Sequence, residues 1–264
     1  MKMKSFFTFS FMLIMLSNIT AQENKRNFKI HTVAFYNLEN LFDTINDVNK
    51  NDEASPIMEI RFNRGKIYRE KVSNMAEVVS QIGFDVTKRP PSIVGICEVE
   101  NRMVVEDLIS DEKLREYNYG IVHYESPDDR GIDVGLIYNK DVFKVKNSNS
   151  HDVFITDNNS SKRRNTRDQL VVSGHLDGEL MHFIVNHWPS RGADETKRIA
   201  AAEVNNFIID SLRNKYESPK IITMGDFNDD PFDKSIKKIL GAKKNINDIK
   251  KNDLYNPFET ILVD

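Results

Sequence analysis

The sequence is short of cysteine, and this scarcity limits the chemistry that it can support. Cys97 is the single cysteine among 264 residues, so no disulfide can form within the chain. The residue lies in an apolar run, which predicts a buried, inert thiol rather than a nucleophile. A cluster of cysteine ligands for zinc is excluded as well.

An excess of positive charge is also absent. Lysine and arginine number 37, aspartate and glutamate number 40, and the formal net charge is −3. An acidic protein does not coat nucleic acid non-specifically, because such binding depends on neutralising many phosphates. A polyanionic substrate must therefore be held by local arginines and metal ions.

Long hydrophobic runs are missing, and the one apolar stretch lies near the N-terminus. Residues 5–16 are apolar, follow a basic start and precede small polar residues up to Ala21. This order is typical of a secretory signal peptide, and the stretch is too short to span a membrane comfortably. We expect residues 1–21 to be removed and residues 22–264 to form one secreted or periplasmic domain without stable membrane association.

Short runs rich in Val, Ile, Phe and Tyr recur between clusters of Asn, Asp, Gly and Pro, and they predict strands. The predicted strands span 32–36, 92–97, 120–124, 133–138, 170–173, 182–186 and 221–224. Because strands outnumber helices and do not alternate with them, we expect an α+β layered sandwich rather than a doubly wound sheet.

Apolar periodicity predicts helices over residues 66–82 and 196–215. A third, short helix is expected over 234–240, capped by Asp233. Two polar stretches, 46–64 and 147–166, predict long loops. The second loop contains a run of three basic residues, Lys-Arg-Arg, which more often marks a solvated loop than a binding patch.

Polar side chains follow several of these strands where each strand ends. They include Asn37, Glu39, Glu98, Glu100, Asn186, His187, Asp226 and Asn228. Polar groups at strand ends gather along one rim of a sheet, where binding sites usually form. Carboxylate and amide oxygens suit Mg²⁺, Mn²⁺ or Ca²⁺, and such a cation can polarise a phosphoryl oxygen and activate water.

Each of these residues also has a structural interpretation. His187 could be a satisfied interior histidine, and Trp188 is more typical of an aromatic residue packed at the rim. Asp226 and Asn228 lie in a segment, 224–231, whose composition favours a turn. In extended geometry, however, side chains two residues apart face the same way, which would present the carboxylate and the amide side by side.

Six segments carry a resemblance to a known family. They are Phe35–Phe42, Gly95–Asn101, Arg130–Tyr138, Thr166–Asp168, Val185–Arg191 and Gly225–Asn228. Together they resemble the endonuclease/exonuclease/phosphatase (DNase I-like) superfamily, and within it the secreted bacterial branch. The resemblance runs in order from about residue 28 to 259, and it implies a four-layer α/β/β/α sandwich.

The resemblance implies which residues bind the metal ion or lie beside it. Glu98 matches the acid that binds the divalent metal, which would be Mg²⁺, or alternatively Mn²⁺ or Ca²⁺. Glu39 lies where a second acidic group supports this ligand. Asn37 matches the asparagine that orients the catalytic groups near the metal.

The resemblance also implies which residues contact the phosphate and the attacking water. His187 matches the histidine that contacts the scissile phosphate and can act as an acid. Asp226 matches the aspartate that orients or activates the attacking water, and Asn228 matches the asparagine that holds a phosphate oxygen. Arg167 and Arg191 fall where the family places arginines that contact phosphate.

The function implied is divalent-metal-dependent hydrolysis of phosphate esters by a monomeric, secreted endonuclease or phosphodiesterase, with nucleic acid among the possible substrates. Relatives continue through two further motifs that end in Ser-Asp-His, and no histidine follows His187 here. We therefore expect a C-terminally truncated sandwich that lacks the last strands and hydrolyses poorly. One alternative is an inactive remnant or binding protein. Another is a phosphatase or phospholipase-type enzyme for a lipid or inositol headgroup.

Overall fold

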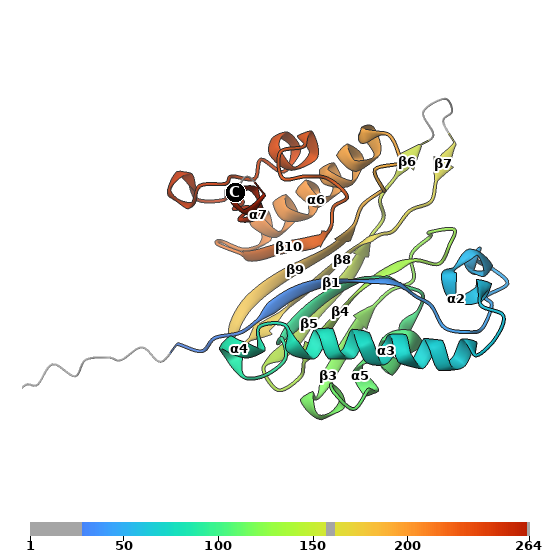
Figure 1. Cartoon of the computed structure of the whole chain (residues 1–264). Coiled ribbons are helices and arrows are strands. Elements are labelled where there is room, and N and C mark those ends of the chain that lie inside the picture. Colours follow the sequence, from blue (N-terminus) through green and yellow to red (C-terminus); the bar gives the residue numbers. More distant parts are fainter. Residues whose placement is uncertain (1–27, 157–161, 263–264) are drawn as a thin grey trace, which may run out of the picture. The chain divides into compact units, whose positions relative to one another are not determined.

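The computed structural model describes residues 28–156 and 162–262. The chain divides into two units, 1–30 and His31–Asp264. All described helices and strands belong to the second unit (Figure 1). The expected signal peptide, residues 1–21, lies outside the described residues. Within the described part, none of the helices has both the length and the apolar character that crossing a membrane requires.

One four-stranded sheet contains the first strands of the chain. Its order is β1 (Val33–Leu41), β2 (Ile93–Val99), β4 (Asp133–Asn139) and β3 (Tyr119–His123). β1 and β2 are parallel, whereas β4 runs antiparallel to both of its neighbours. The interior strand β2 is an almost continuous apolar run that is buried on both faces.

The second sheet contains the later strands. Its order is β10 (Lys220–Asp226), β9 (Glu179–His187), β8 (Gln169–Leu176) and β5 (Phe143–His151). β9 and β10 are parallel, and the other two pairs are antiparallel. Because β9 and β10 run in the same direction, their carboxyl ends lie at the same edge of this sheet.

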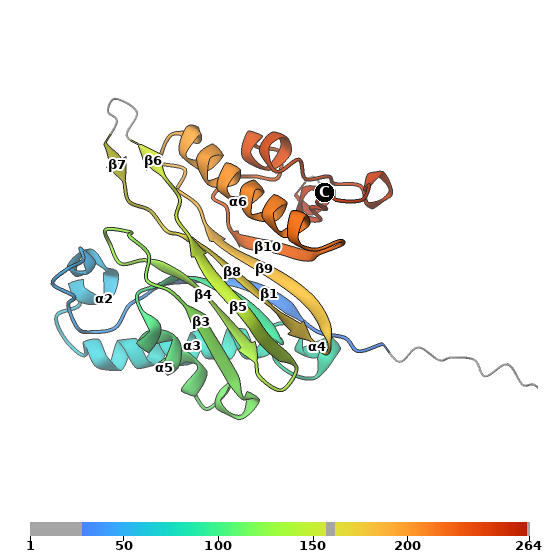
Figure 2. The same cartoon turned by 180° about the vertical axis from the view of Figure 1, so that it is seen from behind.

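The two sheets pack face to face around a shared apolar core. Its buried members include Cys97, Leu136, Phe143, Phe183 and Val185. The Phe143 ring meets Phe183 edge to face at a centroid distance of 5.5 Å. This core holds β1 and β2 of the first sheet against β9 and β10 of the second (Figures 1 and 2).

Helices cover the outer faces of both sheets. α3 (Arg64–Gln81) and α5 (Arg102–Ser110) pack on the first sheet, and α6 (Glu195–Lys215) packs on the second (Figure 1). The carboxylate of Asp194 caps α6 by accepting a hydrogen bond from the Thr196 amide at 2.9 Å. The predicted α+β four-layer sandwich and its two long helices are therefore confirmed.

The third predicted helix is a π-helical turn rather than an α-helix. Residues Ser235–Ile239 (η3) form a π-helical turn in which the Leu240 amide donates to the Ser235 carbonyl. Asp233 is not its side-chain cap. The Asp233 carboxylate instead accepts hydrogen bonds from the Asp230 amide and from Arg191, because the turn before η3 has its own donors to satisfy.

The two predicted loops contain regular structure. Within 147–166, β5 continues to its end and a two-stranded hairpin follows, formed by β6 (Ile155–Thr156) and β7 (Arg163–Arg164). Polar β5 was missed because it is an edge strand with one exposed face. Among the described residues, six further short helices lie outside the sheets: η1 (Asp52–Ala54), α2 (Pro56–Glu59), α4 (Phe84–Thr87), η2 (Arg115–Tyr117), η4 (Ile246–Asp248) and α7 (Phe258–Ile261).

Candidate active site

The carboxylate of Glu98 is fixed where two strands leave their regular pairing. The register between β1 and β2 shifts between Asn37 and Leu41, and that between β2 and β4 shifts between Cys97 and Val99. Glu98 lies in this bulge with a φ of 58°, which is uncommon for a residue with a side chain. Its two oxygens accept hydrogen bonds from Asn37 Nδ2 at 3.0 Å and from the Asn40 amide at 2.9 Å.

The side chain of Asn37 joins the two sheets. Its Nδ2 donates both to Glu98 Oε1 and, at 3.2 Å, to Asp226 Oδ2 of the second sheet. The amide oxygen accepts from the Glu39 amide at 2.7 Å, which fixes the orientation of the side chain. Asn37 therefore brings two carboxylates to one place, and its predicted role in catalysis stays a prediction.

His187 lies beside these carboxylates at the end of β9. It is the register partner of Asp226, and its Nε2 lies 3.7 Å from Glu98 Oε1. Burial, together with the nearby Arg167 and Arg130, holds the pKa of His187 well below its usual 6.5. The imidazole is therefore neutral at pH 7. Its buried Nδ1 has no hydrogen-bond partner among the described residues.

Asn228 reaches the site through a turn rather than through strand geometry. β10 ends at Asp226, and Asn228 has a φ of 50°. The Asn228 amide donates to Asp226 Oδ1 at 3.0 Å, and its side-chain Nδ2 donates to the Trp188 carbonyl at 3.0 Å. Asn228 is therefore not in the predicted extended geometry, because an aspartate turn, not strand alternation, sets the two side chains.

A buried ion pair supports the base of the site. Arg167 donates to Asp128 Oδ2 at 3.3 Å and to the Trp188 carbonyl at 2.6 Å, and both charged side chains are almost fully buried. Trp188 itself is 1% exposed and packs edge to face on Phe227, which agrees with the expected packing role directly after the end of β9. Asp128 was not singled out in the sequence, because an aspartate in a Pro-Asp-Asp turn gives no signal of an ion pair.

Two predicted site residues lie apart from this group. The Glu39 side chain is exposed and does not line the cleft, although its amide holds Asn37. Arg191 is also exposed and pairs with Asp230 and Asp233 while donating to the Asn228 carbonyl at 3.1 Å. In this structure Arg191 braces the turn that carries Asn228.

The thiol of Cys97 lies unexpectedly near the site. It is fully buried, and burial raises its pKa, which agrees with an inert thiol. The ligand-capable atoms of Cys97, His187 and Asp226 nevertheless lie within 4.8 Å of one another. Sequence reasoning missed this proximity because the three residues come from strands that are distant in the chain.

The site opens into a cleft of about 460 Å³. Its walls include Glu98, His187 and Asn228 together with basic residues from other segments. The basic lining residues are Arg130, Arg164, Arg167 and Lys197. The cleft carries acids as well as bases, because Asp128 and Asp129 line it together with Glu98.

Comparison with known proteins decides the family. Residues 32–264 match the model of the Endonuclease/Exonuclease/phosphatase family. The chain belongs to this family. No curated protein was found to resemble it.

Solved structures with TM-scores above 0.5 show the same fold at low identity. An endonuclease/exonuclease/phosphatase family protein from Bacteroides thetaiotaomicron is 20% identical, with a TM-score of 0.53, over 79% of this chain and 66% of that one. The mannosyl-6-phosphatase of the same organism is 18% identical, with a TM-score of 0.52, over 79% and 69%. Truncated Caenorhabditis elegans TDP2 is 19% identical, with a TM-score of 0.43, and the match covers 61% of this chain and only 56% of that one.

Endonuclease/exonuclease/phosphatase enzymes generally use divalent metals, and the residues present here fit such an ion. The Glu98 and Asp226 carboxylates converge on one amide nitrogen, which offers only a partial positive charge against their mutual repulsion. Their oxygen donors are the type that Mg²⁺ and Mn²⁺ prefer. A cation held by Glu98 and Asp226 would polarise a bound phosphate oxygen.

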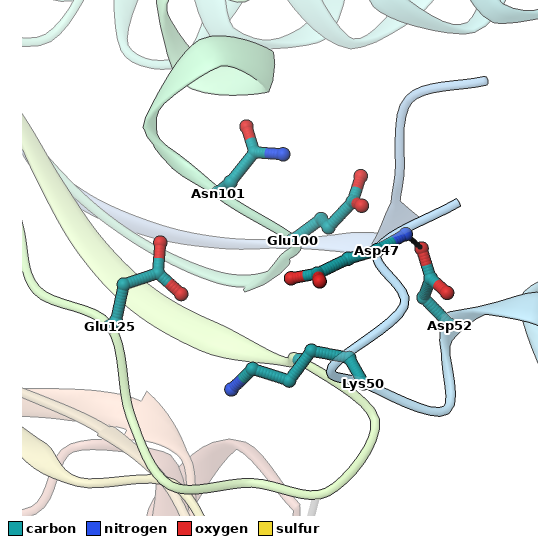
Figure 3. A pocket seen from close by; sticks show the side chains of 7 residues that line it. Asp47, Lys50, Asp52, Glu100, Asn101 and Glu125 are labelled. Atoms are coloured by element: carbon teal, nitrogen blue, oxygen red, sulfur yellow. Dashed lines mark hydrogen bonds between the residues drawn. The ribbon is translucent and has the colours of Figure 1, made fainter. Parts of the chain in front are cut away.

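A second, acidic cavity of about 130 Å³ shares no lining residue with the cleft. Figure 3 shows its lining side chains, and the full lining is Asp47, Lys50, Asp52, Glu100, Asn101, Glu125 and Gly131. Lys50 Nζ donates to the carbonyls of Ser126 and Asp128, at 3.1 and 3.4 Å. Lys50 therefore fixes the loop that carries Asp128, the ion-pair partner of Arg167.

Glu100 is the acid of this cavity with the most altered ionisation. It is 7% exposed, and one of its oxygens accepts a hydrogen bond from the Asp43 amide at 2.6 Å. Burial, with smaller contributions from the neighbouring aspartates, raises the pKa of Glu100 from 4.5 to about 7. Glu100 lines this second cavity, whereas Glu98 lines the cleft.

Glu100→Gln is expected to stabilise the protein above pH 7 and to have little effect near pH 5. Between pH 4.5 and 7 the unfolded chain releases the Glu100 proton while the folded chain retains it, so the free energy of unfolding falls as pH rises through this window. A glutamine side chain does not ionise, so the variant avoids this loss of unfolding free energy. Its side-chain oxygen still accepts the hydrogen bond from the Asp43 amide. We expect the melting temperature at pH 8 to rise by about 2–6 °C.

Thermal unfolding of both proteins in EDTA at pH 5 and pH 8 measures this effect. Glu106→Gln is the matched control, because Glu106 is exposed and pairs only with Arg102 on the same helix. An equal shift at both pH values would show that the carboxylate of Glu100 is not protonated in the folded protein.

Proposed function

We propose that the protein is a divalent-metal-dependent phosphodiesterase, secreted or periplasmic, that hydrolyses phosphate esters by attack of water. The observation that supports this proposal is the convergence of Asn37, Glu98, Asp226 and His187 from both sheets, with Glu98 and His187 lining one cleft. Membership in the endonuclease/exonuclease/phosphatase family supports the reaction class. The basic N-terminal segment followed by an apolar run supports export.

Each side chain has a distinct task in the proposed reaction. Glu98 and Asp226 would hold the metal, which would supply Lewis-acid stabilisation of charge on the phosphate. Asp226 is fixed by Asn37 and by the Asn228 amide, so its carboxylate is oriented to accept a proton from the attacking water. Because His187 is neutral at pH 7, one of its nitrogens can donate a hydrogen bond to a phosphate oxygen.

Hydrolysis of bis-p-nitrophenyl phosphate in Mg²⁺ or Mn²⁺ tests the proposal directly. We expect turnover that EDTA abolishes, and Mn²⁺ binding by calorimetry that weakens at least about tenfold in Glu98→Gln. Glu106→Gln serves as the control, because it removes a glutamate carboxylate outside the cleft. Metal binding that Glu98→Gln leaves unchanged would contradict the assignment of Glu98.

A further inference from the structure

The β6–β7 hairpin forms a basic wall of the cleft. Ile155 of β6 is paired with Arg164 of β7, and Thr156 is paired with Arg163. Directly opposed residues of an antiparallel pair share one face of the ribbon, and the next pair faces the other way. Accordingly Ile155 and Arg164 line the cleft, whereas Thr156 and Arg163 do not.

The two neighbouring arginines of β7 differ in their partners. Arg163 forms an ion pair with Asp152, and its guanidinium lies 5.5 Å from the centre of the Phe154 ring. Arg164 is exposed, and within residues 28–156 and 162–262 no ion pair is found for it. The run that the sequence assigned to a solvated loop thus presents one arginine to the cleft and one to the outside.

A second arginine of the cleft lies in the loop that the hairpin contacts. Arg130 also lines the cleft, with its side chain 54% exposed and its Nε 3.6 Å from Asp128 Oδ1. The hairpin and this loop are joined, because Asn165 Nδ2 donates to Asp129 Oδ1 at 3.0 Å. This bond engages the Asp129 carboxylate, the acid closest in sequence to Arg130, and holds the hairpin against the loop.

We propose that Arg164, with Arg130, binds a second phosphate group of the substrate beside the phosphate that is hydrolysed. The inference rests on the proposed function and deepens it by naming the substrate class: phosphate esters that carry a second phosphate group. A cleft of about 460 Å³ falls within the range of sites that enclose a small organic ligand, which is more than one phosphate needs. Guanidinium groups match phosphate geometry with paired N–H donors.

Calorimetric binding of two matched dinucleotides, in the presence of Ca²⁺, tests the proposal. TpT carries one phosphate and pTpT carries two. We expect Arg164→Gln to weaken pTpT binding about tenfold more than TpT binding, because one charge-assisted contact is lost. Arg163→Gln, the adjacent arginine on the outer face, should leave the ratio of the two dissociation constants unchanged.

Two further arms complete the experiment. Fructose 1,6-bisphosphate compared with fructose 6-phosphate separates a sugar bisphosphate from a nucleotide as the source of the second phosphate. The slope of the logarithm of pTpT affinity against the logarithm of salt concentration should decrease by about one in Arg164→Gln, because one fewer counterion is released. The proposal is overturned when the ratio of dissociation constants is the same in both arginine variants for both ligand pairs. Failure of the proposed function would appear separately, as absent hydrolysis of bis-p-nitrophenyl phosphate.

Discussion

Asp226→Asn is expected to lower kcat on bis-p-nitrophenyl phosphate by about 10²–10⁴-fold. The substitution removes the negative charge that accepts the proton of the attacking water in the proposed reaction. It also places an amide opposite Asn37 Nδ2, which at present donates to Asp226 Oδ2. Two donors then face each other, so the side chain that joins the sheets loses one of its two acceptors.

Steady-state hydrolysis in Mg²⁺ measures this effect, with circular dichroism as the check on folding. Asp230→Asn is the matched control, since Asp230 follows on the same turn but pairs with Arg191 outside the cleft. A folded Asp226→Asn protein with kcat within threefold of the parent would show that Asp226 is not a catalytic residue.

Arg167→Met should destabilise the fold by about 3 kcal/mol, because it leaves the Asp128 carboxylate buried without its main charged partner. Asp128 retains the Arg130 amide at 3.0 Å and the Arg130 guanidinium at 3.6 Å, which limits the loss. For a domain of this size the melting temperature should fall by about 6–12 °C. Loss of the donor to the Trp188 carbonyl should also loosen Asn228, which shares that acceptor.

Urea unfolding of Arg167→Met and Arg163→Met separates a buried pair from an exposed one. Arg163 pairs with Asp152 at the surface, where such a pair is worth about 0.2–1 kcal/mol. Adding Asp128→Asn to Arg167→Met should recover part of the stability, since the unpaired charge is then gone. No recovery in the double variant would mean that lost packing, rather than the uncompensated charge, causes the effect.

The sequence predicts the strands that are buried on both faces, because an apolar run between polar clusters allows few other structures. β2 is such a case, and its predicted and observed limits differ by two residues or fewer. β5 was missed because five or more of its side chains are polar and it is held by pairing with β8 alone. That pairing is long-range and leaves no local pattern in the sequence.

The candidate site, like the strands, could be predicted from the sequence only in part. Asn37, Glu98, His187 and Asp226 were predicted from their positions at strand ends, and the structure brings them together. The partner of a residue is harder to predict than the residue itself. Asp128 beside Arg167, and the two different faces of Arg163 and Arg164, depend on how a loop and a hairpin fold against the sandwich.

The bridge made by Asn37 has a consequence for variation elsewhere in the chain. Glu98 belongs to one sheet and Asp226 to the other, so the separation of these carboxylates is set by the thickness of the core between the sheets. A larger or smaller side chain at a core position such as Phe143 or Phe183 changes that thickness without touching the cleft. In the proposed reaction, such a substitution would alter the distance between the two carboxylates and so the rate, in addition to its effect on the stability of the fold.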